Sequence, residues 1–156
     1  ASLFVCGSEP GKASRCYVRS VDGGNLRPVT PEGADEGIVS PDGRFAVVRR
    51  VTGEFLMCPL KGDSAQPIPF LGTNDNLIRW SPDGRALWVF KANETPTRIE
   101  RLDPVTGRRE LLQEITPLGT AGFFTIMTIS LADDPKAYCY SSWEYSSRLF
   151  SIEGVK

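Results

Sequence analysis

The chain has 156 residues, a formal net charge of −1, and 24% charged against 40% hydrophobic residues. This is the composition of a folded domain, and its near-zero charge gives no field that would attract nucleic acid or an acidic membrane surface. No apolar stretch approaches the ~18 residues of a membrane span, so we expect no direct membrane insertion. The absence of histidine excludes Ser-His-Asp triads and zinc-histidine sites within the chain. We therefore expect no catalytic residue, no cofactor and no metal site.

Two short runs of strand-forming residues open the chain, at residues 2–6 and 15–19. The segment 7–13 between them resembles a phosphate-binding loop, but its glycines are too close together, so a hairpin loop is expected instead. Cys6 and Cys16 lie on these two consecutive strands, where a cross-strand disulfide is geometrically feasible. The interpretation that we favour is that all four cysteines are small core residues on strands.

A pentapeptide is repeated further along the chain. Ser-Pro-Asp-Gly-Arg occupies residues 40–44 and again 81–85, each time before an apolar run. Proline fixes φ, aspartate accepts a hydrogen bond from the backbone ahead of it, and glycine adopts the left-handed conformation that follows. Each copy therefore predicts a hairpin turn between two strands, and the period indicates a repeat protein. The structural turn residues are Pro41, Asp42, Gly43, Pro82, Asp83 and Gly84.

The rest of the repeat can be laid out around these turns. Strands are predicted at 36–39, 45–48, 54–58 and 66–70 in one copy, and at 76–80 and 86–90 in the next. Four strands in about forty residues are typical of a β-propeller blade. Pro67 and Pro69 place both missing N–H groups on one side of the fourth strand, which predicts that this strand is the outer edge of the blade.

A degenerate copy completes the chain. Residues 130–136 stand where the third turn should be, 137–140 form the apolar strand after it, and 148–152 form a last strand. Trp80 and Trp88 are expected between blades, whereas Trp143 is equally compatible with a buried and an exposed position. The fold class is thus all-β, a single partial β-propeller of about three and a half four-stranded antiparallel blades. Its parts are a blade remnant at 1–31, blades at 32–70 and 71–116, and a partial blade at 117–156.

An open arc of blades leaves two apolar flanks, because propellers need roughly four to eight blades to close. We expect the flanks to be covered by self-association or by the remaining propeller blades of a longer parent chain. The flank residues are Leu3, Val5, Tyr17, Tyr138, Tyr140 and Leu149.

The repeat resembles the TolB-like propeller blade, a WD-repeat-like unit of bacterial proteins. Residues 138–142 and 147–156 resemble the C-terminus of TolB-like propellers attached to eukaryotic-like serine/threonine protein kinases, notably of acidobacteria. The resemblance implies a non-catalytic interaction or sensing module, the C-terminal propeller fragment of a receptor-like kinase, with the missing blades before Ala1. The location would be periplasmic or extracytoplasmic if the parent is membrane-anchored, and cytoplasmic otherwise. The kinase motifs themselves are absent from this chain.

Two other functions remain open. Similar repeats form the propeller gate of serine peptidases of the prolyl-oligopeptidase kind, and a TolB-like periplasmic scaffold protein is the third alternative. Propellers usually bind on the face built by the connections between blades and the loops between second and third strands. The candidate partner-binding residues on that face are Asp35, Glu36, Asn74, Asp75, Asn76, Phe123, Phe124 and Trp143. The partner, a protein or a small ligand, is not identified by the sequence.

Overall fold

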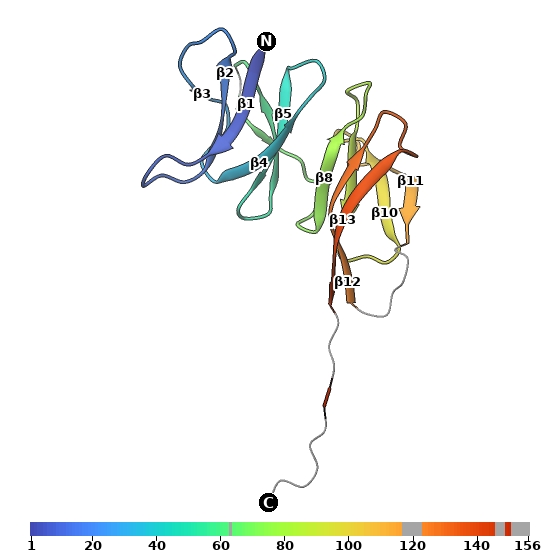
Figure 1. The fold of residues 1–156 in the computed structure, drawn as a ribbon. Helices are drawn as coiled ribbons and strands as arrows, with labels where there is room; N and C mark the ends of the chain where they lie inside the picture. Colours follow the sequence, from blue (N-terminus) through green and yellow to red (C-terminus); the bar gives the residue numbers. More distant parts are fainter. Residues whose placement is uncertain (63, 117–122, 146–148, 151–156) are drawn as a thin grey trace, which may run out of the picture.

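The computed structural model of the chain describes residues 1–62, 64–116, 123–145 and 149–150. The described residues contain strands and no helix, which confirms the all-β prediction (Figure 1). They contain no helix long and apolar enough to cross a membrane. The strands are β1 (Ser2–Gly7), β2 (Arg15–Ser20), β3 (Arg27–Pro28), β4 (Ala34–Val39), β5 (Phe45–Arg50), β6 (Phe55–Pro59), β7 (Gln66–Pro67), β8 (Asp75–Trp80), β9 (Leu87–Lys91), β10 (Thr97–Leu102), β11 (Arg109–Ile115), β12 (Phe123–Leu131) and β13 (Tyr138–Tyr145).

The strands pair in chain order within four antiparallel sheets. Two of the sheets in the described residues have four strands, with the orders β4-β5-β6-β7 and β8-β9-β10-β11, as the predicted fold class of four-stranded antiparallel blades requires. The sheet before them has three strands, β1-β2-β3, and the sheet after them has two, β12-β13. The fourth strand β7 lies at the sheet edge as predicted, but it ends at Pro67. Pro69 lies beyond it, and the Ile68 N–H between the two prolines donates to the Phe55 carbonyl of β6 at 2.9 Å, so both missing N–H groups face away from β6.

The repeated pentapeptides form the predicted turns. Gly43 and Gly84 have φ of 67° and 69°, the left-handed region that the turn requires. The Asp42 carboxylate accepts the Arg44 N–H at 3.0 Å, and Asp83 repeats this contact. The serine hydroxyl and the backbone N–H groups hold each carboxylate in its charged form, which lowers the pKa of both aspartates.

The degenerate third turn keeps part of this chemistry. The Asp134 carboxylate accepts the Lys136 N–H at 3.0 Å, as its counterparts do in the first two turns. Pro135 stands where those turns have glycine, and the backbone closes differently, with the Ala137 N–H donating to the Asp134 carbonyl at 3.0 Å. The hairpin between β12 and β13 thus confirms the turn predicted at 130–136.

Three apolar clusters lie between successive sheets and stack them into an arc. The second cluster contains Trp80 and the third contains Trp88, so both tryptophans occupy the predicted positions between blades. The Trp80 indole N–H also crosses to the previous blade and donates to the Ile38 carbonyl at 3.3 Å. The first cluster is built from small residues, among them Ala34, Ala46 and Cys58. Burial on both faces of the inner sheets therefore holds the blades together.

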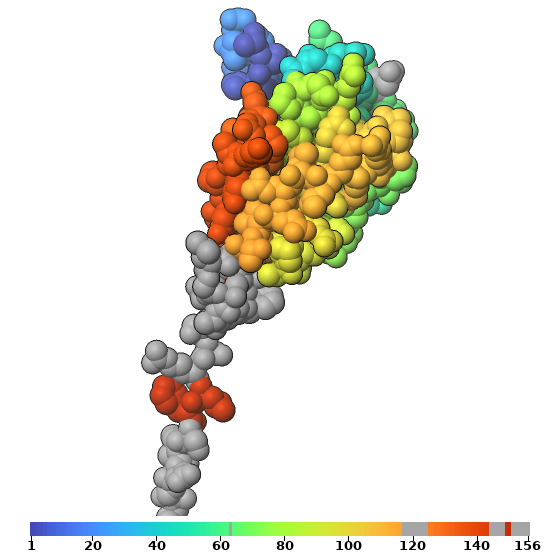
Figure 2. Space-filling model, turned by 90° about the vertical axis from the view of Figure 1, so that its right-hand side faces the viewer, coloured from blue at the N-terminus to red at the C-terminus, as the bar shows by residue number. Residues whose placement is uncertain are grey.

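The two end sheets keep exposed apolar side chains. Leu3 and Val5 on β1 are 55% and 44% exposed, and Tyr17 is half-buried. Tyr138 and Tyr140 on β13 are also exposed, and in Figure 2 the orange-red surface of this sheet lies at the margin of the molecule. The strand predicted at 148–152 falls largely outside the described residues, and Leu149 and Phe150 are exposed and in no strand.

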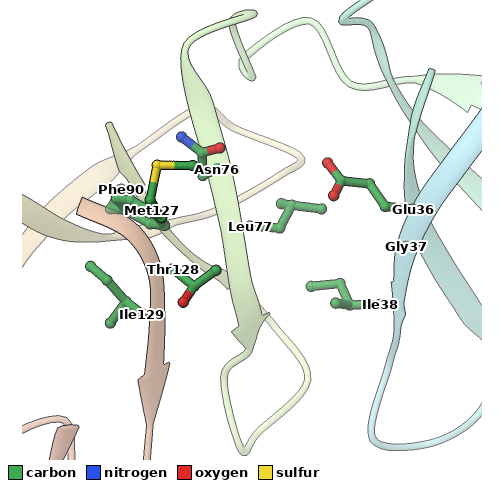
Figure 3. A pocket seen from close by; sticks show the side chains of 9 residues that line it. All are labelled: Glu36, Gly37, Ile38, Asn76, Leu77, Phe90, Met127, Thr128 and Ile129. Carbon is green, nitrogen blue, oxygen red and sulfur yellow. The ribbon is translucent and has the colours of Figure 1, made fainter. Parts of the chain in front are cut away.

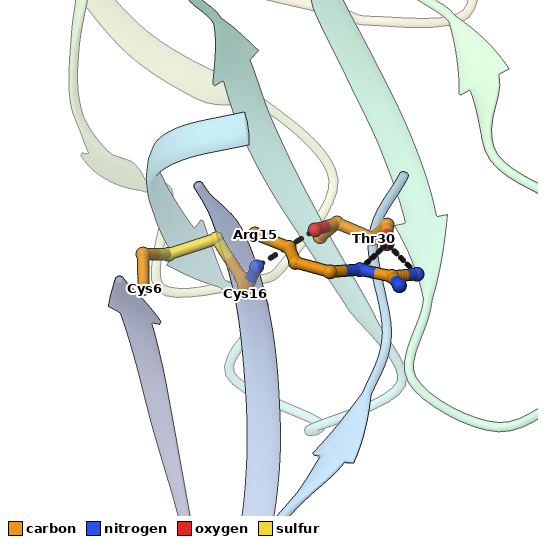
Figure 4. The surroundings of a disulfide bond; sticks show 4 residues. All are labelled: Cys6, Arg15, Cys16 and Thr30. Atoms are coloured by element: carbon orange, nitrogen blue, oxygen red, sulfur yellow. Dashed lines mark hydrogen bonds between the residues drawn. A yellow bond between two sulfur atoms is a disulfide. The ribbon is translucent and has the colours of Figure 1, made fainter. Parts of the chain in front are cut away.

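The prediction that all four cysteines are small core residues is wrong in part, because Cys139 is exposed and two of the others are cross-linked. Cys6 and Cys16 form a disulfide between β1 and β2 (Figure 4). The strand register places the two residues directly opposite one another, with their Cα atoms 3.9 Å apart, and this pairing was open from the sequence alone. Cys58 is a buried free thiol as expected, and burial raises the pKa of the thiol to about 11. Cys139 is a free thiol on the surface.

Candidate functional site

The first strands of three successive sheets lie side by side and form a groove. β8 contacts β4 on one side and β12 on the other. The groove has a volume of about 250 Å³, and Figure 3 shows the Glu36 and Ile38 side chains of β4 facing Leu77 of β8. Its lining mixes apolar surface with acidic, amide and hydroxyl groups. The lining residues are Glu36, Gly37, Ile38, Asn76, Leu77, Phe90, Met127, Thr128 and Ile129.

A second, more polar hollow of about 440 Å³ adjoins the groove and shares Glu36 with it. It lies where the loop after β5 meets the connection from β7 to β8. Arg49 spans it, with its guanidinium 3.5 Å from the Glu36 carboxylate and 3.0 Å from the Thr73 carbonyl. The hollow therefore offers charged groups of both signs beside an apolar groove, an arrangement suited to binding a mixed polar and apolar surface.

Several predicted partner-binding residues lie at these two hollows. Glu36 and Asn76 line the groove, Asp35 lines the second hollow, and Asn74 is exposed in the connection before β8. Glu36 and Asn76 lie in strands β4 and β8, as the predicted strands at 36–39 and 76–80 imply, and Asp35 also belongs to β4. The strands begin slightly earlier than predicted, at Ala34 and Asp75, and each contains a β-bulge.

Asp75 is a structural residue and is not presented to a partner. It is only 2% exposed, and its carboxylate accepts the Gly72 N–H at 2.8 Å and Arg109 Nη2 at 2.7 Å. Arg109 also contacts Glu100 at 2.7 Å. The hydrogen bonding of the Arg109 guanidinium to the Asp75 carboxylate is the main cause that raises the pKa of Arg109. This ion network ties the start of β8 to the outer strand of the same blade, so the Asp75 prediction is corrected.

The aromatic candidates lie on the last sheet. Phe123 and Phe124 open strand β12, paired with Tyr145 and Glu144, and not in the connection where they were expected. Their side chains lie outside what the structure describes. Trp143 is on strand β13, is 58% exposed, and does not line the groove. The structure thus brings Glu36 and Asn76 together and leaves Trp143 elsewhere.

The contribution of β12 to the groove was not predicted from the sequence. Met127, Thr128 and Ile129 line it opposite β4, and their strand is the counterpart of β4 and β8 in the degenerate third repeat. Aligning the third turn with the first two turns, and then comparing the segments that precede each turn, would have identified these residues. The described residues contain no group of three or more His, Cys, Asp or Glu side chains that could hold a metal ion. The hollows can bind through shape, hydrogen bonds and charge.

No protein-family model matches the sequence, and no curated protein matches it. Solved structures do match the fold. TolB from Acinetobacter baumannii superposes with a TM-score of 0.65 at 19% identity, over 89% of this chain and 34% of that one. A protein described as TolB from Agrobacterium tumefaciens gives 0.55 at 18% identity, over 89% and 53%. The β-propeller domain of the Trilobed protease from Pyrococcus furiosus, described as having an open velcro topology, gives 0.50 at 16%, over 94% and 51%.

These similarities show the fold. The chain has the fold of a partial β-propeller, as the repeated turns predicted. It spans about a third of the length of the first match and about half of the other two. At such low identity, the function of those proteins does not carry over to this chain.

Proposed function

We propose that the chain is part of a non-catalytic propeller module that binds or senses a partner across its first strands. The observation that carries this proposal is the groove on β4, β8 and β12, which gathers side chains from three blades at one place. Glu36 and Arg49 add a charged margin to its apolar floor. The chain has no histidine, the side chain that acts most often as a general base, beside this groove.

The parent that we favour is a receptor-like serine/threonine protein kinase, with this chain as its C-terminal propeller part. The likeness of residues 138–142 and 147–156 to the tails of such proteins supports this assignment. The disulfide between Cys6 and Cys16 supports an extracytoplasmic or periplasmic location, because disulfides persist in oxidising compartments. Thiol alkylation of the denatured, unreduced chain from the native cell tests the location. Of the four cysteines of this chain, only Cys58 and Cys139 should be labelled, and labelling of Cys6 and Cys16 as well would contradict an oxidising compartment.

Two other parents each have one observation in their favour. The match to a protease propeller favours a gate domain of a prolyl-oligopeptidase-like serine peptidase. The matches to TolB favour a periplasmic scaffold protein. The gene around the coding segment distinguishes them, since a kinase with a membrane span, a hydrolase domain, or a secretion signal alone each identifies one parent.

Site-specific photocrosslinking tests the groove. A photoreactive amino acid at Glu36 or Asn76 should give covalent adducts in cells of the source organism. The matched control is Arg85, which is exposed in the turn at the other end of the blade and should give none. Equal adducts at all three positions, or adducts at Arg85 alone, would contradict binding across the first strands.

Incubation with labelled ATP and a generic acceptor protein tests the non-catalytic assignment. We expect no phosphoryl transfer, because the chain has neither a phosphate-binding glycine loop nor the metal-binding Asp motif of kinases. Incorporation that follows the purified chain through successive columns would overturn it.

A further inference from the structure

Strand β1 has a free edge at the place where the complete blades have their first strand. The three-stranded sheet corresponds to the last three strands of a blade, because β3 and β7 are both two-residue outer strands that end in proline. Tyr17 pairs with Pro28 as Leu56 pairs with Pro67, so β2 matches β6 and β1 matches β5. In the complete blade β5 lies beside β4. No strand of the described part of the chain lies at that position beside β1.

The backbone of β1 presents unused hydrogen-bonding groups along this edge. The Cys16 N–H donates to the Thr30 hydroxyl at 2.8 Å (Figure 4). The Cys16 C=O accepts the Val29 N–H at 2.9 Å, so both backbone groups of Cys16 bond on the side of β3. The backbone groups of Cys16 therefore do not bond Cys6, whose own N–H and C=O point away from β2. Because bonding alternates along an antiparallel pair, Phe4 and Ser2 present their groups to the same free edge.

The sequence of β1 lacks the devices that protect the outer edges of the first three sheets. The outer strands β3 and β7 carry Pro28 and Pro67, and β11 carries Arg109, Glu110 and Glu114. Strand β1, Ser-Leu-Phe-Val-Cys-Gly, has neither proline nor charge. Natural proteins blunt or cover exposed sheet edges, and an apolar edge without such protection is a template for pairing with another strand.

The neighbouring blade already packs beside the position where a first strand would pair with β1. β4 contacts both β1 and β2, and a Cβ placed on Gly37 would lie 3.4 Å from the Phe4 ring. Phe4 and Cys6 pack against the small-residue cluster between the two sheets. The free edge of β1 is thus held in place by packing on one face and by the disulfide, while its hydrogen-bonding groups stay open.

We infer that the free edge of β1 binds the first strand of a further propeller repeat, antiparallel to β1 and about six residues long. The repeat's own strands β4 and β8, each of six residues, define the kind of segment that fits. Within this chain Ile38 of β4 is paired with Val47, the counterpart of Phe4. The incoming strand should therefore place an Ile38-like residue opposite Phe4. The free edge of β1 lies on the side of β4 that faces away from the groove, and the inference does not depend on the function proposed above.

A fusion tests the inference. A copy of residues 33–44, which contain strand β4 and its turn, is joined in front of Ser2, so that the added strand can fold back onto β1. Exchange of the Phe4 and Cys6 amide protons, followed by NMR, should slow by at least about tenfold relative to the unfused chain. The matched control carries the same insert with Ile38→Pro in the copy, which removes the N–H opposite Phe4 and should leave exchange fast.

Each result is measured at a concentration where sedimentation gives the mass of a single chain. Amides of Phe4 and Cys6 that are already protected in the unfused single chain would overturn the inference, because the edge would then be occupied from within the chain. Equal exchange rates in the fusion and its proline control would overturn it as well. The amides of Leu3 and Val5, which face β2, should be slow in all three proteins and report that β1 is folded.

Discussion

A single methyl group at Gly107 should destabilise the chain far more than the same change at Gly62. Both glycines lie in the turn between the third and fourth strands of their blades, and both have positive φ, 76° and 89°. A Cβ at Gly62 meets no described atom within 4 Å, whereas at Gly107 it would lie 2.5 to 2.8 Å from three ring atoms of Phe70. Backbone strain costs ~1 kcal/mol at either position. Overpacking adds about 1–3 kcal/mol at Gly107 alone.

Urea unfolding of Gly62→Ala and Gly107→Ala measures the difference. The free energy of unfolding should fall by ~1 kcal/mol in the first variant and by ~2–4 kcal/mol in the second. Phe70 belongs to the connection between the two complete blades, and Phe70→Ala removes the ring that the new methyl group meets. In that background Gly107→Ala should cost only ~1 kcal/mol. Equal losses for the two glycine variants, or no relief in the Phe70→Ala background, would refute this packing of one blade against the turn of the next.

Two further predictions concern charged groups. Arg109→Met should lower the free energy of unfolding by ~3 kcal/mol in a urea titration, because it leaves the buried Asp75 carboxylate without its partner. In the control, Arg98→Met removes the exposed ion pair with Glu114 and should lower the free energy of unfolding by less than ~1 kcal/mol. The pKa of Asp42 and of Asp83 is lowered in the folded chain, so their contribution to stability is present above the unfolded value and is lost as the pH falls through the folded one. Thermal unfolding between pH 5 and 2 should therefore show a smaller loss of stability in the double Asp→Asn variant, and unchanged pH dependence would contradict the turn geometry.

The parts of the fold that depend on local chemistry could be predicted from the sequence. The turns around Gly43 and Gly84 follow from proline, aspartate and glycine at fixed positions, and each of these acts on its own backbone. Trp80 and Trp88 could be placed between blades because strand alternation fixes which face a side chain takes. The third turn was recognisable even without its glycine, since Asp134 keeps the same backbone contact.

The parts of the fold and of the site that depend on contacts between residues far apart in the sequence could not be predicted from it. Asp75 and Arg109 are 34 residues apart, and nothing local in either segment marks them as partners, so Asp75 looked like a loop carboxylate. The groove needs Glu36 and Thr128 on the same surface, which only the stacking of three blades provides. The β-bulge between Leu77 and Arg79 shifts which side chains face the groove, and no residue type announces it.

Sedimentation across a concentration series tests most directly whether the chain is an open sector of a propeller. If the two end faces each bury about 500 Å² of apolar surface on contact, the gross hydrophobic free energy gained is on the order of 25 kcal/mol. Association costs on the order of 4–15 kcal/mol or more, together with side-chain ordering. We therefore predict a mass that rises above that of one chain as concentration increases, and Leu3→Lys on β1 combined with Tyr140→Lys on β13 should shift the rise to higher concentration. A single-chain mass at every concentration would contradict the open sector, because it would mean that the end faces are already covered.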